Sequence, residues 1–286
     1  MRGCPSECLQ APARRAILVS VTREGGGVVV EHRGPVTWIR LNRPRRCNAL
    51  TYPVLEELLE VCGEAADDPS ARVIVLTGTG SAFCAGGDIH HLLEDTRGEL
   101  TEVERRDRLA RLHRISWLLH TMEKPTIAAV NGPAVAAGLS LALACDFRVM
   151  SATATLGSAF AHLGVPGDFG GTWFAARLLG LALAKELYLL DEPITAEEAL
   201  RHGLVTSVAA PEEFAVAVGA MAERLARGPA AAFGLMKANF AAALSTPLEE
   251  FLDSEATNMI LGMETKEFEG AARAFVEGRL PGCPGS

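Results

Sequence analysis

Hydrophobic and polar positions alternate along the N-terminal part of the chain in a pattern typical of β-strands. The alternation covers residues 17–22, 28–32 and 36–41, which are rich in β-branched types, and Gly25-Gly26-Gly27 joins the first two segments. Because successive side chains of a strand point to opposite faces of a sheet, this pattern predicts an N-terminal β-meander.

Strand and helix patterns alternate after this meander. A helical period begins after Thr51 and leads to a short apolar strand at 73–76. A charged helical region from about 100 to 122 precedes a second apolar strand at 126–130. A helix and another strand follow, and Thr195 begins a capping box for a later helix. Beyond Pro211 the period is helical only, over 212–227, 229–243, 247–262 and 264–277.

This order of elements predicts an α/β fold with three parts. We expect a flexible N-terminal arm at 1–16, an α/β core at 17–210 and a C-terminal helical module at 211–286. The chain has 286 residues, of which 49% are hydrophobic. A chain of that size can bury a core large enough to hold a dry cavity.

Charge, cysteine content and turn residues argue against three classes of protein: nucleic-acid-binding, metal-binding and membrane-spanning. Lys and Arg number 27 against 35 Asp and Glu, a formal charge of −8, which argues against a nucleic-acid partner. The seven cysteines form no CxxC pair, so we expect reduced thiols in a cytoplasmic protein and no metal site. The uncharged stretch 125–145 is broken by Gly132-Pro133 and Gly138, which favours a globular core over a membrane span.

Two segments share a design suited to stabilising negative charge. Residues 75–89 and 127–138 each run from an apolar strand through a turn rich in Gly and Ala to the start of a helix. Such turns let backbone N–H groups approach a ligand closely, and the helix dipole favours an anion there. Tight helix–strand packing alone would explain either segment, but together they suggest an oxyanion hole.

The residues of these segments resemble the crotonase (enoyl-CoA hydratase/isomerase) superfamily. The resemblance rests on the runs 83–89, 124–132 and 144–146, and continues through 163–171, 196–205 and 267–275 in the family's order. It implies a spiral of β-β-α turns with a C-terminal helical trimerisation module. It also implies an acyl-CoA thioester substrate, a homotrimer or dimer of trimers, and no cofactor other than the coenzyme A of the substrate.

The resemblance also assigns residues to the site. The N–H groups of Gly87 and Ala137 would form the oxyanion hole. Residues 42–50 resemble the segment that lines coenzyme A, where Arg45 and Arg46 would pair with phosphate, unless they are simply solvated. Asp88 is more readily interpreted as a helix cap. The positions expected to line the substrate are Arg45, Cys47, Ala49, Ala85, Asp88, Ile89, Gly138, Ser140, Phe160 and Trp173.

Three positions set this chain apart from the hydratases of the family. Ser140 and Phe160 stand where the resemblance places the two hydratase glutamates, and neither side chain is a competent general base. Asp168 instead resembles the proton-shuttling aspartate of the family's isomerases, although it could also cap the helix that begins near Gly170. We therefore expect an acyl-CoA isomerase that uses Asp168.

Three alternatives to the isomerase remain open at this stage. The first is a hydratase or lyase in which Asp168 alone activates water. The second is a binding scaffold that has lost catalysis, and the third is a hydrolase that uses Ser140, His162 and Asp168 as a triad.

Overall fold

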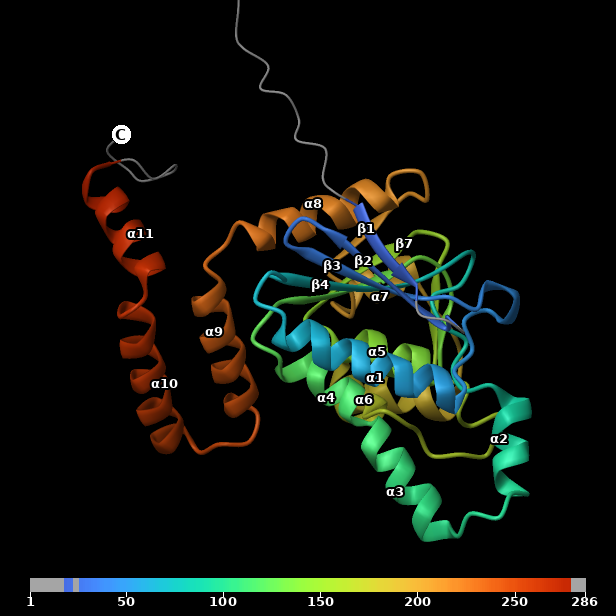
Figure 1. Ribbon diagram of the computed structural model, residues 1–286. Helices are drawn as coiled ribbons and strands as arrows, with labels where there is room; N and C mark the ends of the chain where they lie inside the picture. Colours follow the sequence, from blue (N-terminus) through green and yellow to red (C-terminus); the bar gives the residue numbers. More distant parts are fainter. Residues whose placement is uncertain (1–17, 23–25, 279–286) are drawn as a thin grey trace, which may run out of the picture.

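The computed structural model describes residues 18–22 and 26–278, and Figure 1 shows a twisted sheet with helices on both faces. Within these residues, seven strands form the main sheet in the order β1-β2-β3-β4-β5-β7-β10. The first three pair antiparallel and the others pair parallel. Their bounds are β1 Leu18–Thr22, β2 Val28–Arg33, β3 Val36–Leu41, β4 Val73–Gly78, β5 Thr126–Val130, β7 Phe147–Ser151 and β10 Ser207–Ala209.

The predicted meander is therefore present, and the expected arm at 1–16 lies outside the described residues. A smaller sheet joins three short strands that the sequence pattern did not predict. These are β6 (Ala134–Val135), β8 (Thr155–Gly157) and β9 (Ile194–Thr195), in the order β6-β8-β9.

The alternation along β3 gives the main sheet two different faces. Val36 and Trp38 pack with Val218 and Ala222 of helix α8 (Phe214–Ala226), whereas Ile39 and Leu41 belong to a larger core on the other face. Figure 1 shows α8 above the strands and α1 (Tyr52–Asp67), α4 (Arg114–Thr121) and α5 (Ala137–Ala144) below them.

The remaining helices before residue 210 connect the strands. The charged region that predicts one helix contains two, α3 (Glu102–Leu112) and α4, which meet at His113. The capping box is confirmed at α7 (Ala196–Arg201), where Thr195 and Glu198 exchange both expected hydrogen bonds. The others are the 3-10 turn η1 (Pro44–Arg46), α2 (Ile89–Thr96), α6 (Gly171–Lys185) with a break at Gly180, and the π-helix η2 (Glu186–Leu190).

Helix α5 is buried along its whole length and is anchored at its C-terminal end. The guanidinium of Arg148 lies beneath that end and donates to the carbonyls of Cys145 and Leu204, at 2.6 Å each. Asp146, just after the helix, accepts the N–H of Thr126 at 2.8 Å and pairs with Lys237 at 2.6 Å. Asp146 is thus a structural residue.

After residue 211 the described chain is helical. Helix α8 covers the sheet, and Figure 1 shows α10 (Leu248–Met263) and α11 (Lys266–Val276) standing away from it beyond α9 (Ala230–Ala243). These helices expose large apolar side chains, including Phe240, Leu248, Ile260 and Phe275. Of the helices in the described residues, none combines the length and hydropathy needed to span a bilayer.

Candidate active site

The first Gly/Ala-rich turn leads from β4 to α2 and leaves the backbone N–H of Gly87 without an acceptor among the described residues. Leu50 donates its N–H to the carbonyl of Gly86 (2.7 Å) and accepts the N–H of Asp88 (2.8 Å). Gly87 lies between these two bonds, and its own N–H has no acceptor among the described residues. This amide is therefore available to a ligand.

The second turn leaves a similar donor at the start of α5. Ala136, just before the helix, has a φ of 51° and a ψ of −119°, a strained backbone for a residue with a Cβ. The N–H of Ala136 donates to the carbonyl of Gly157 at 3.0 Å. The next amide, that of Ala137, is the first of the helix and finds no acceptor within the described chain.

The two turns touch each other. A Cβ at Gly86, whose φ is 86°, would lie 2.8 Å from the Cβ of Ala136 and 3.4 Å from the nitrogen of Ala137. A Cβ at Gly138 would lie 2.3 Å from the carbonyl oxygen of Cys84. Glycine is therefore required at both positions, and two free amides are held in adjacent turns at a helix N-terminus.

Asn48 supports the first turn from below, a role that the sequence did not reveal. Its side-chain nitrogen donates to the carbonyls of Thr79 (3.0 Å), Ala82 (2.8 Å) and Phe83 (3.3 Å). Its backbone φ is 56°, and asparagine tolerates this left-handed region better than most residues.

The segment expected to line coenzyme A has exposed side chains at its surface and is held from inside by hydrogen bonds. Arg45, Arg46, Cys47, Ala85 and Ile89 are exposed, and the N–H of Ala85 donates to the carbonyl of Cys47 at 3.0 Å.

The interior of this segment is tied by Arg43, which donates to the carbonyl of half-buried Ala49 (2.5 Å) and to Asp88 Oδ2 (3.1 Å). Asp88 occupies the N-cap position of α2, as expected, and its carboxylate pairs with Arg43. Burial alone would raise the pKa of Asp88, but the hydrogen bonds of Arg43 and of the His91 backbone, together with the charges of Arg43 and Arg46, outweigh burial and lower that pKa.

Asp168 lies against a histidine from the helix pair α3–α4. Its Oδ1 is 2.5 Å from Nε2 of His113 and accepts the N–H of Phe169 at 2.8 Å, while Oδ2 has no partner among the described residues. The carboxylate is 27% exposed, and His113 packs edge-on against the ring of Phe169. The interpretation of Asp168 as a cap is wrong, because Gly170 is the N-cap of α6.

The loop that carries Asp168 lies beside three further side chains, those of Ser140, Phe160 and Tyr188. Ser140 is fully buried and donates to the carbonyl of Ala136 at 3.3 Å. Phe160 stacks on Tyr188 with ring centroids 5.9 Å apart, and both line an apolar cavity of about 330 Å³ with Val165 and Pro166. Burial raises the pKa of the Tyr188 phenol to about 12, although the nearby Ser140 hydroxyl opposes the rise.

The start of α6 joins Asp168 to the second turn. A Cβ at Gly171 would lie 2.2 Å from Ser140 Oγ and 2.3 Å from the Tyr188 hydroxyl, so α6 begins directly on the first turn of α5. Asp168 precedes Gly171 by three residues, and Ala137 precedes Ser140 by three.

Two expected neighbours lie elsewhere. Trp173 packs against His120 and Phe174 and lines a separate cavity of about 530 Å³ that extends to Phe240 of α9. His162 contacts Asp191, with Nδ1 and Oδ2 2.5 Å apart, and is not paired with Asp168. The hypothetical triad of Ser140, His162 and Asp168 is therefore not assembled.

Comparison with known proteins agrees with this architecture. Residues 31–283 match the family model for enoyl-CoA hydratase/isomerase. The chain is 35% identical to 4-chlorobenzoyl coenzyme A dehalogenase-2 of Arthrobacter sp., over 84% of this chain and 87% of that protein. It is 34% identical to crotonyl-CoA hydratase of Syntrophomonas wolfei, over 88% and 95% of the respective chains.

A solved structure shows the same fold. The enoyl-CoA hydratase of Bacillus anthracis superposes with a TM-score of 0.82 at 31% identity, covering 91% of this chain and all of that one. The expected spiral α/β fold is confirmed, and the chain belongs to the enoyl-CoA hydratase/isomerase, or crotonase, family.

Proposed function

We propose that this chain is an acyl-CoA isomerase whose reacting side chain is Asp168. The observation that carries the proposal is the state of that carboxylate: one oxygen is held by His113 and Phe169, and the other has no partner in the described part of the chain. Ser140 is buried on the carbonyl of Ala136, and Phe160 carries no titratable group, so neither supplies a second base.

The free amides of Gly87 and Ala137 would hold the thioester oxygen. Donors fixed where negative charge develops stabilise an enolate, and losing one typically costs about 10²- to 10³-fold in rate. Asp168 removes a proton from C2 of a 3-enoyl thioester, and the C–H electron pair enters the conjugated system with its charge on that oxygen. Asp168 then returns the proton to C4, which moves the double bond to C2–C3. No separate cofactor takes part.

The contact between His113 and Asp168 favours a second candidate, hydrolytic dehalogenation of an aroyl-CoA. The free Oδ2 would attack the ring carbon that bears the halogen, and halide would leave with the carbon–halogen electron pair. His113 would then take a proton from water, which hydrolyses the resulting aspartyl ester and frees the hydroxyaroyl product. Relatives named as dehalogenases add weight to this candidate.

Three substrates and two variants separate these reactions. A 3-enoyl-CoA, a 2-enoyl-CoA and 4-chlorobenzoyl-CoA are incubated with the wild type, Asp168→Asn and His113→Gln. Isomerisation moves the double bond without adding water, hydration adds water to the 2-enoyl-CoA, and dehalogenation releases chloride. We expect Asp168→Asn to lose at least about 10²-fold of the isomerase rate.

The histidine variant distinguishes the two roles of Asp168. In an isomerase, His113→Gln slows turnover only through the orientation of the carboxylate. In a dehalogenase it blocks ester hydrolysis, so a covalent adduct on Asp168 accumulates and is visible by mass spectrometry. His202→Gln, an exposed histidine after α7, is the matched control. Full activity of Asp168→Asn refutes both proposals, and acyl-CoA binding without turnover indicates a scaffold.

The exposed apolar side chains of α9, α10 and α11 support the proposal that the chain assembles as a homotrimer or dimer of trimers. We expect the same helices to mediate the contact. Sedimentation equilibrium of the full chain measures the oligomeric state. A monomer at all protein concentrations would contradict the proposed trimer or dimer of trimers.

A further inference from the structure

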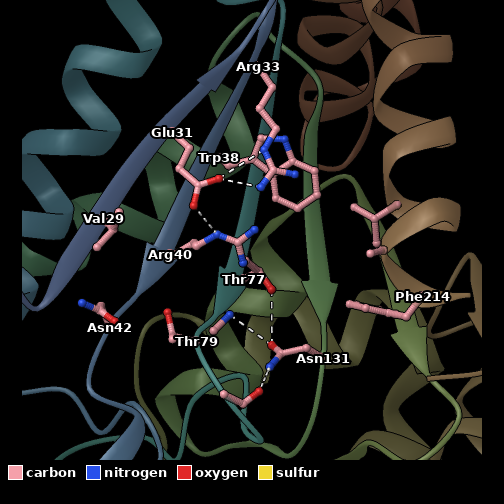
Figure 2. A pocket seen from close by; sticks show the side chains of 14 residues that line it. Val29, Glu31, Arg33, Trp38, Arg40, Asn42, Thr77, Thr79, Asn131 and Phe214 are labelled. Carbon is pink, nitrogen blue, oxygen red and sulfur yellow. Dashed lines mark hydrogen bonds and ion pairs between the residues drawn. The ribbon is translucent and has the colours of Figure 1, made fainter. Parts of the chain in front are cut away.

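A second pocket lies on the face of the sheet that carries α8. It is a groove of about 520 Å³ between β2, β3, the C-terminal end of β4 and the first turns of α8 (Figure 2). Its lining includes the charged residues Glu31, Arg33 and Arg40 of β2 and β3 and the apolar residues Phe214 and Ala215 of α8. The free amides of Gly87 and Ala137 are not part of it.

The strand register brings the charged groups together. Glu31 of β2 lies opposite Trp38 of β3, with Arg33 two residues along its own strand and Arg40 two residues along the neighbouring one. Both guanidinium groups lie over the indole ring, at 4.5 and 5.3 Å from its centre. Two cations thus cover Trp38, on the same face of the sheet on which Val36 packs against α8.

Glu31 fixes both arginines in one orientation. Its Oε2 accepts from Nε and Nη2 of Arg33, at 3.1 and 2.6 Å, and its Oε1 accepts from Nε of Arg40 at 3.0 Å. Burial would raise the pKa of Glu31, but the hydrogen bonds and charges of both arginines outweigh this and lower it. The carboxylate therefore stays ionised and neutralises only one of the two cations.

The remaining donors of the arginines are free. Both Nη atoms of Arg40 and Nη1 of Arg33 have no partner among the described residues, and Figure 2 shows the Arg40 guanidinium in the middle of the groove. The hydroxyl of Thr79 is also without a partner in the described chain, and Figure 2 places it below Arg40. A guanidinium held through Nε presents its two Nη groups as a fork that matches phosphate or carboxylate oxygens.

The opposite wall is apolar: Figure 2 shows Phe214 of α8 across from Arg40, and Ala215 of the same helix also lines the groove. The floor is Asn131, whose amide is fully engaged: Oδ1 accepts from Gly78 N–H at 3.1 Å and Nδ2 donates to Gly80 at 2.9 Å. The volume lies within the range of small-molecule sites, which combine apolar walls with a few placed polar groups.

We propose that this groove binds a small organic anion, a phosphate monoester or carboxylate, whose oxygens are held by the Arg40 fork and whose apolar body packs on Phe214 and Ala215 of α8. This site is additional to the acyl-CoA site and does not depend on its chemistry. It borders Asn131 and Thr79, which begin the loops to the two Gly/Ala-rich turns, so its occupant would touch both loops.

Calorimetric titration of the full chain with three probes tests the proposal. Phenyl phosphate and benzoate carry the two oxyanion types on the same apolar ring, and benzamide is the uncharged control. We expect saturable one-to-one binding of at least one anion and none of benzamide. The two anionic arms show which oxyanion the fork prefers. Asp168→Asn should bind the same probe with unchanged affinity.

Two variants change the affinity in opposite directions. Arg40→Met removes the fork and should weaken binding by about 10- to 100-fold, because hydrogen bonds to charged groups are the strong ones. Glu31→Gln leaves both cations unopposed and should tighten binding. Arg201→Gln, an exposed arginine on α7 paired with Glu197, is the control and should leave affinity unchanged. Thermal unfolding of each variant confirms that it is folded.

Three outcomes would overturn the proposal. The first is no saturable binding of either anion at millimolar concentration. The second is unchanged affinity in both Arg40→Met and Glu31→Gln. The third is displacement of the bound probe by free coenzyme A, which would make the groove part of the substrate site.

Discussion

Replacing Gly171 by alanine tests the contact that joins α5 to α6. The new Cβ would lie 2.2 Å from Ser140 Oγ, 2.3 Å from the Tyr188 hydroxyl and 3.1 Å from Ser140 Cβ. Carbon atoms pack at about 3.5–4.0 Å, so both oxygens would have to withdraw by roughly 1 Å or more. Both side chains are buried and have little room to move. Overpacking of this kind costs about 1–3 kcal/mol, and we expect the upper half of that range.

Urea denaturation measures the loss, and Gly63→Ala is the matched control. Gly63 lies within α1 with no atom near its Cβ position, so alanine there should stabilise the fold by about 0.5–1 kcal/mol. Adding Ser140→Ala and Tyr188→Phe to Gly171→Ala removes both oxygens and should recover much of the lost stability, because neighbouring substitutions are not additive. Wild-type stability of Gly171→Ala, or no recovery in the triple variant, would refute the reasoning.

Three further substitutions test local features. Asp191→Asn should cost roughly 2–3 kcal/mol near neutral pH, since the buried carboxylate accepts from Ser158 (2.6 Å), Ala159 (2.5 Å) and His162. These bonds outweigh burial and lower its pKa, so its contribution is complete above the unfolded-state pKa and is lost as pH falls through the folded-state value. Urea unfolding should therefore show the difference from wild type shrinking below about pH 4; a constant difference would contradict this. Asn48→Asp replaces a donor by an acceptor facing three carbonyls, and calorimetric unfolding should show a loss of about 2 kcal/mol or more. Thr195→Ala removes the cap of α7 and should cost about 1 kcal/mol, seen as a lower melting temperature.

The parts of the fold that follow local rules could be predicted from the sequence. The apolar run at 73–76 forms the first four residues of β4, and Thr195 caps α7 as its spacing predicts, because both features depend on neighbouring residues. Strands β6 and β9 have only two residues each, too few to show a period. The sequence pattern does not predict the break at His113, because a charged helical pattern continues across it.

Of the candidate site, the sequence predicts the backbone turns, whereas the roles of Gly87 and Ala137 stay predictions. Small residues reveal the two turns around Gly87 and Ala137, because only they allow such close approach. The partner of Asp168 could not be predicted, since His113 lies 55 residues away and only the tertiary fold brings the two together. Trp173 shows the converse: it is close to Asp168 in sequence, but the helix turns its ring toward His120.

The buried guanidinium of Arg148 has a consequence for the far end of α5. The helix has eight residues, which at about 1.5 Å each makes it roughly 12 Å long. A cation beneath its C-terminus and an anion at its N-terminus each interact favourably with the helix dipole. Because Arg148 and α5 are enclosed by protein, dissolved ions cannot screen this field as they would between exposed charges. The attraction for an anion at Gly87 and Ala137 should therefore persist at high ionic strength.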